Sequence, residues 1–236
     1  MPINDVLFQR LRIAQRPDLL LLLGDLKLNR ERFNAKPNDE IIETISATLR
    51  SVGGHSLVNP IRERHELSYK QILVDVADKL APGRMNWSQF RVSGSESEVE
   101  IEDYIAHCLE SRTKDLLASM SHGNKQELQA RLEADMRSKG VPESVVQATI
   151  TGVSTGAFAG VAIGPLIASL LFSGLWTSIF GLTAAQMLVG GVAVGGPVGI
   201  GLAGIAVVCG PSYGKTIPAV YRLILVRKSA EARGAV

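Results

Sequence analysis

Residues 144–214 read SVVQATITGVSTGAFAGVAIGPLIASLLFSGLWTSIFGLTAAQMLVGGVAVGGPVGIGLAGIAVVCGPSYG, about 70 positions without one Asp, Glu, Lys, Arg or His. All but one of the 23 acidic residues precede this stretch, and the exception is Glu231. Helices of soluble proteins normally carry charge on their outer face. The sequence therefore divides into a charged N-terminal part and an uncharged part, which we call the apolar segment (residues 144–214).

The apolar segment has room for two helices, expected over 153–172 and 184–208 with a turn in 174–183. Since about 20 apolar residues span a bilayer, a transmembrane hairpin is one interpretation. A hairpin that inserts only when amphipathic helices release it is the second, and a buried core of a soluble protein is the third. The lack of charge favours membrane contact, although Gly, Ala, Ser and Thr contribute little to insertion.

Basic residues flank the apolar segment on both sides. Arg137 and Lys139 precede it, and the cations Lys215, Arg222, Arg227 and Lys228 follow it, before a last one at Arg233. By the positive-inside rule, both termini are expected in the cytoplasm and the protein in the cytoplasmic membrane; the alternative is a cytoplasmic protein. The first four of these C-terminal cations are expected to set this topology or to meet lipid headgroups.

Glycines recur every four residues within the apolar segment: Gly152, Gly156, Gly160 and Gly164, then Gly191, Gly195 and Gly199. This spacing places each set on one face of a helix, where another backbone can approach closely. It predicts helix packing through glycine faces, with homo-oligomerisation as one form of that packing. Pro197 is expected to kink or interrupt the second helix.

The preceding 143 residues are expected to form a soluble all-α domain of about six short helices, divided into a module over 1–36 and a central block over 37–143. Starts are indicated by capping residues and first-turn prolines, at Asn4, Pro17, Asn38, Asn59–Pro60, Ser97 and Asn124. Residues 144–236 then form the apolar hairpin and a basic C-terminal helix. The predicted fold class is all-α.

Signals for catalysis are absent from the sequence. The stretch CGPSYGKT at 209–216 looks like a phosphate-binding loop, but Gly210 and Gly214 are separated by three residues instead of four. The four histidines lack the spacing of a metal site. We therefore expect no enzyme, no cofactor and no metal, and the basic residues at the C-terminus are too few for a nucleic-acid site.

Two blocks of residues resemble the bacterial YaaW family. The first contains GGHSL at 53–57, Asn59 and YKQILVDVADKL at 69–80; the second contains GGPVG at 195–199, GPSY at 210–213 and TIPAV at 216–220. The resemblance covers most of the chain. It implies a distant grouping with the ubiquinol–cytochrome c chaperones and no catalytic residues.

Two functions fit these observations. The first is a non-enzymatic, membrane-associated protein that binds a protein partner through its N-terminal domain and packs helices through the hairpin, in an assembly or chaperone-like role. The alternative is a membrane-permeabilising stress or defence effector whose hairpin oligomerises in the bilayer.

Overall fold

A computed structural model describes residues 5–53, 67–80, 95–138, 140–156, 163–172 and 213–234. These residues form nine α-helices, one 3-10 helix and no strand, which confirms the all-α prediction. The helices are α1 Val6–Ile13, α2 Arg16–Asp25, η1 Arg30–Phe33, α3 Asn38–Gly53, α4 Tyr69–Leu80, α5 Glu98–Ser119, α6 His122–Ser138, α7 Glu143–Thr155, α8 Ile163–Phe172 and α11 Tyr213–Ala232.

Within these described ranges, no helix is both long and apolar enough to span a bilayer. The described residues thus give no support to the membrane-inserting hairpin, and the helix expected over 184–208 and its turn lie outside them. The helix expected over 153–172 differs in the structure, because α7 ends at Thr155 and α8 begins at Ile163.

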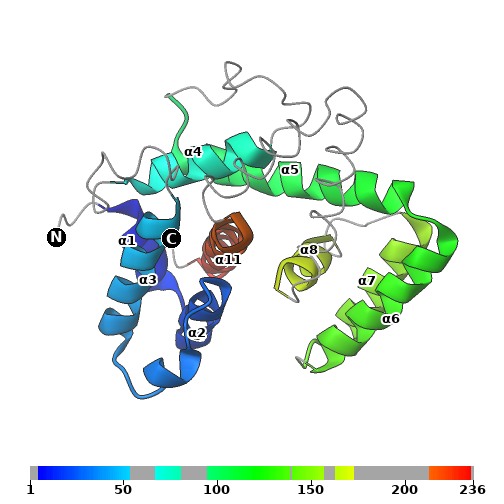
Figure 1. The fold of residues 1–236 in the computed structure, drawn as a ribbon, viewed down its shortest axis with the longest axis horizontal. Helices are drawn as coiled ribbons and strands as arrows, with labels where there is room; N and C mark the ends of the chain where they lie inside the picture. The colour runs from blue at the N-terminus through cyan, green and yellow to red at the C-terminus, as the bar shows by residue number, and fades with distance from the viewer. Residues whose placement is uncertain are drawn as a thin grey trace, which may run out of the picture. The chain divides into compact units, whose positions relative to one another are not determined.

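The contacts between residues divide the chain into two compact units. Unit 1 comprises Met1–Ala106 and Gln186–Val236, and unit 2 comprises His107–Ala185. In unit 1, α11 contacts α1, α2, α3 and α4 (Figure 1). By sequence, the C-terminal helix is grouped with the apolar hairpin. In the structure, this helix packs with the N-terminal helices.

Helix α3 illustrates how the sequence forms unit 1. It begins at Asn38, as predicted, ends at Gly53, and buries Ile41, Ile45 and Leu49 on one face. These residues lie three to four positions apart, the period of one helix face. Gly53 ends α3 against α4, where an added Cβ would lie 2.9 Å from Ile72 Cγ1.

Serine caps set the starts of three other helices. Ser97 and Glu100 form the reciprocal hydrogen bonds of a capping box at the start of α5. This agrees with the helix start that the sequence predicts at Ser97. Helix α6 begins before Asn124, because Ser121 Oγ accepts the Asn124 N–H at 3.3 Å. Likewise α4 begins at Tyr69, where Ser68 Oγ accepts a backbone N–H; the Asn59–Pro60 start lies outside the described residues.

Unit 2 contains residues 144–156 and 163–172, the described part of the apolar segment apart from the first two residues of α11. Helices α7 and α8 pack with each other and with the charged helix α6, burying Leu128, Leu132, Met136, Val146, Val153, Leu166, Ile167 and Leu170. Ser169 of α8 donates a hydrogen bond of 2.8 Å to Asp135 of α6. Residues 144–155 and 163–172 therefore bury apolar side chains against protein.

Glu143 offers a pH-dependent test of unit 2. Its carboxylate accepts hydrogen bonds from Arg137, at 2.8 Å and 3.2 Å, and from Gln147 at 2.7 Å. The Arg137 hydrogen bond, then that of Gln147, lowers the pKa of Glu143 to about 2. A carboxyl whose folded pKa is depressed contributes stability above its unfolded pKa and loses it as pH falls through the folded value. NMR titration should therefore show a pKa near 2, which Arg137→Gln raises; a value near 4.5, the ordinary pKa, would contradict this contact.

Candidate functional site

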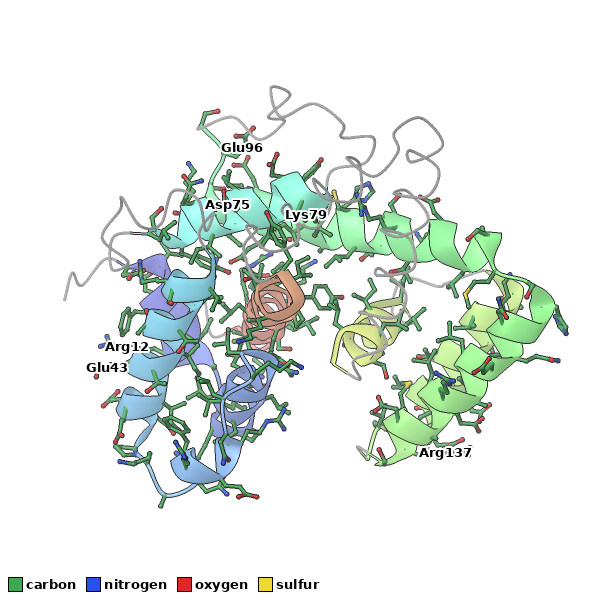
Figure 2. The ribbon with its side chains drawn as sticks, viewed as in Figure 1. Arg12, Glu43, Asp75, Lys79, Glu96 and Arg137 are labelled. Carbon is green, nitrogen blue, oxygen red and sulfur yellow. The ribbon has the colours of Figure 1, made fainter. Side chains whose placement is uncertain are left out.

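The C-terminal helix α11 carries two arginines into the interior of unit 1. Arg222 is 7% exposed and Arg227 is 3% exposed. Apolar residues surround them on all sides of α11, including Ile217, Val220, Leu223 and Ile224 at 5% exposure or less. A helix that is apolar all round is a buried helix, and a buried charge requires partners. Figure 2 shows side chains of the neighbouring helices crowding around α11.

Arg227 belongs to a cluster centred on Glu102, which is 0% exposed. The Glu102 carboxylate accepts hydrogen bonds from Arg227 Nε at 2.5 Å, from the Tyr69 hydroxyl at 3.0 Å and from Arg10 Nε at 3.3 Å. These four residues come from α5, α11, α4 and α1. We call them the Glu102 cluster.

The other nitrogens of Arg227 reach the edge of unit 1. Nη2 donates to Asp103 at 2.6 Å and Nη1 donates to Glu231 at 2.8 Å. Burial lowers the pKa of Arg227, but the hydrogen bonds to Glu231 and Asp103 and the charge of Glu102 together raise it above its ordinary value. Arg227 therefore keeps its positive charge.

Tyr69 is the neutral member of the Glu102 cluster. Burial raises its pKa well above the ordinary value, and the charge of Glu102 and the hydrogen bond to it act in the same direction. The hydroxyl therefore keeps its proton and donates a hydrogen bond to the Glu102 carboxylate.

A second buried pair joins α11 to α2. Arg222 donates to both oxygens of Asp25, through Nε to Oδ2 and through Nη2 to Oδ1 at 3.3 Å. Burial raises the pKa of Asp25, and this effect exceeds the lowering by Arg222. The pair thus joins α11 to α2, although removing the Asp25 carboxylate from water is unfavourable.

Both arrangements suit helix docking better than chemistry. The Glu102 carboxylate is surrounded by three donors, and both Asp25 oxygens accept from one guanidinium. In the residues that the structure describes, no three His, Cys, Asp or Glu side chains gather as metal ligands would.

The four cations expected at lipid headgroups occupy different environments. Arg222 and Arg227 are buried inside unit 1, where carboxylates pair with them. Lys228 is exposed, with its Nζ 3.6 Å from Asp103 Oδ1. Lys215 is half-buried.

The first glycine set does not line one helix. Gly152 is buried in α7, but Gly156 caps that helix with a left-handed backbone, φ 71°, and Gly164 lies in the next helix, α8. Glycine adopts this conformation without the steric penalty of a Cβ. Gly156 can therefore end α7 instead of continuing it. Gly160, Gly191, Gly195, Gly199 and Pro197 lie outside the described residues.

Gly156→Ala should destabilise unit 2 by about 1 kcal/mol, because an L side chain in the left-handed region is strained. No atom lies within 4 Å of the added Cβ, so the effect is conformational. The control is Gly123→Ala in α6, where the space is equally open and alanine should stabilise the helix. Denaturant unfolding measures both; equal effects would show that Gly156 is not an obligatory helix end.

Sequence reasoning missed Asp25 and Glu102 as partners of α11, and Arg10 as a further donor to Glu102. The available signal was the sequence IPAVYRLILV at 217–226, which has no polar face for Arg222. A buried α11 follows from this pattern, and partners of opposite charge follow from burial. Which carboxylates they are depends on contacts between distant parts of the chain.

Comparison with known proteins gives one match. No family model and no solved structure matches the sequence. The UPF0174 protein YaaW of Escherichia coli O157:H7 is 26% identical over 195 residues, which cover 80% of this chain and 72% of that protein. The match carries no information on ubiquinol–cytochrome c chaperones. It supports a relation between this chain and the YaaW family.

Proposed function

We propose that this chain is a non-enzymatic, membrane-associated helical protein with an assembly or chaperone-like role. Residues 173–212 contact lipid, and the charged helices bind a protein partner on the cytoplasmic side. One observation carries the proposal: a run of 40 residues without charge is tethered at both ends by packed helices. Helix α8 is packed against α6 and α7, and α11 is packed among α1–α4.

The buried ion pairs explain how such a tether holds. A helix fixed only by apolar contacts could follow an apolar segment into lipid, because lipid solvates apolar surface equally well. Arg222 and Arg227 cannot follow it cheaply, since a charged side chain at the centre of a bilayer is disfavoured by at least about 2.5–3.5 kcal/mol. Their carboxylate partners keep α11 in unit 1 while the preceding residues meet the membrane.

The orientation follows from the remaining cations. With Arg222 and Arg227 buried in unit 1, Arg137 and Lys139 before the apolar segment and Lys215 and Lys228 after it supply the flanking positive charge. Both ends are then cytoplasmic by the positive-inside rule.

Cell fractionation tests this proposal with two arginine substitutions. Val192→Arg places a charge near the middle of residues 184–208, and Ala130→Arg places one on the exposed face of α6. After an alkaline carbonate wash, the wild type and Ala130→Arg should stay in the membrane pellet, and Val192→Arg should move towards the supernatant. Recovery of all three proteins in the high-speed supernatant would refute membrane association.

The same strains test the membrane-permeabilising alternative. The end of α7 at Gly156 removes one of the two glycine faces on which that alternative depends. We therefore expect overexpression to leave a membrane-potential dye unchanged. Loss of the potential with the wild type, but not with Val192→Arg, would favour the effector over the assembly role.

A further inference from the structure

The connection between α2 and α3 concentrates exposed positive charge. Residues 27–36, KLNRERFNAK, carry four cations and one carboxylate, Glu31. Lys27, Arg30, Arg32 and Lys36 are all exposed. We call residues 27–36 the basic loop. In contrast to Arg222 and Arg227, which are buried, these cations lie at the surface, where Lys36 pairs with half-exposed Glu40.

Hydrogen bonds hold the basic loop in one conformation. The Arg16 guanidinium of α2 donates to the Asn38 side chain at 2.6 Å and to the carbonyl oxygens of Phe33 and Asn34, at 3.2 Å and 2.7 Å. Asn29 Oδ1 caps η1 by accepting the Glu31 N–H at 3.0 Å. The loop therefore presents its charges without a large loss of conformational entropy on binding.

Lys27 occupies a position where glycine is preferred. Its φ of 61° is left-handed, and among the described residues no other non-glycine residue has a positive φ. The Leu28 N–H bonds the Leu23 carbonyl at 2.8 Å and the Lys27 N–H bonds the Gly24 carbonyl at 3.0 Å, the pattern of a Schellman helix end. The helix dipole favours a cation at the C-terminal end of α2. Lys27 also adds one more positive charge to the basic loop.

We propose that the basic loop docks on the anionic headgroups of a lipid bilayer, an inference that rests on the proposed function. The loop joins α2, and α2 contacts α11, into which the apolar segment leads. Half-buried Phe33 adds an aromatic ring among the cations, a combination typical of segments that bind at the membrane interface. Each such cation strengthens binding to anionic lipid about fivefold.

Vesicle co-sedimentation of the full chain provides the test. The loop variant is Lys27→Gln, Arg32→Gln and Lys36→Gln. The control variant removes three exposed cations elsewhere, Arg12→Gln, Lys114→Gln and Arg131→Gln; Figure 2 shows Arg12 on the outer side of its bundle. The sets are matched, because Lys36 pairs with Glu40 as Arg131 pairs with Glu127, in half-exposed i, i+4 ion pairs.

Phosphatidylcholine vesicles with and without 30% phosphatidylglycerol separate charge from apolar binding. The wild type should prefer the anionic vesicles, and the loop variant should lose on the order of 100-fold of this preference while the control variant keeps most of it. Roughly 1 M salt should also remove it, since the Debye length falls to about 3 Å. Binding to neutral vesicles should be the same for all three proteins.

Each other outcome overturns the inference. Equal losses in the two variants would mean that total charge, not the basic loop, sets the preference. A wild type that binds neutral and anionic vesicles equally would overturn the docking site and leave the proposed function intact, whereas binding to neither would contradict both. If the loop variant loses only binding to a polynucleotide, the loop is a nucleic-acid surface.

Discussion

Glu102→Ala is expected to lower the free energy of unfolding of unit 1 by about 3–5 kcal/mol. The substitution leaves the buried Arg227 and Arg10 guanidiniums and the Tyr69 hydroxyl without their common acceptor. Asp103 and Glu231 still neutralise part of the Arg227 charge. Among the described residues, Arg10 forms an ion pair with Glu102 and with no other carboxylate, so the desolvation of Arg10 supplies much of the loss.

Thermal or denaturant unfolding measures this effect. For a unit of this size the melting temperature should fall by on the order of 10 °C. Glu102→Gln should lose less, because the amide oxygen still accepts hydrogen bonds. Glu43→Ala in α3 is the matched control, since Glu43 is exposed on the outer side of the bundle (Figure 2) and should change stability by at most about 0.5 kcal/mol. Equal effects of Glu102→Ala and Glu43→Ala would contradict the cluster.

Asp25→Ala is expected to have a comparable effect, about 3–5 kcal/mol, because it leaves Arg222 charged and buried without its carboxylate. The double variant Asp25→Leu with Arg222→Met should instead unfold at wild-type stability or above it. Replacing both members of a buried pair by apolar residues removes the desolvation of two charges as well as their attraction. A double variant as unstable as Asp25→Ala would show that the attraction exceeds the desolvation.

The titration of Asp25 gives an independent check. Burial raises its folded pKa above the ordinary 3.8, so the folded state holds this proton more tightly than the unfolded state. The stability contributed by this titration is fully present below the unfolded pKa and is lost as pH rises through the folded pKa. NMR should find a pKa above 3.8, and Arg222→Met should raise it further because the guanidinium lowers it.

Local signals predicted the helices where capping and apolar period agree. Helix α3 from Asn38 to Gly53 and the start of α5 after Ser97 follow from neighbouring residues alone. The prediction failed where one residue type serves two structures. A glycine in such a repeat is compatible with a packing face and also with a helix end. Gly156 has a left-handed backbone and ends a helix.

The candidate site was less accessible to sequence reasoning. From the sequence, Arg222 and Arg227 are expected to be flanking charges, because they follow an uncharged segment. Their actual partners lie far away in the chain: Asp25 is 197 residues from Arg222, and Glu102 is 125 residues from Arg227. Such pairs depend on tertiary contacts, which a hydropathy pattern does not specify.

Tryptophan fluorescence tests membrane contact of the apolar segment most directly. The chain has two tryptophans, Trp176 in the apolar segment and Trp87 outside it, so Trp87→Phe reports on the segment and Trp176→Phe is the matched control. Both proteins are mixed with vesicles containing lipids brominated on their acyl chains. The proposed function predicts strong quenching of Trp176 and little quenching of Trp87. Emission from Trp176 that is the same with brominated and ordinary lipids would contradict it.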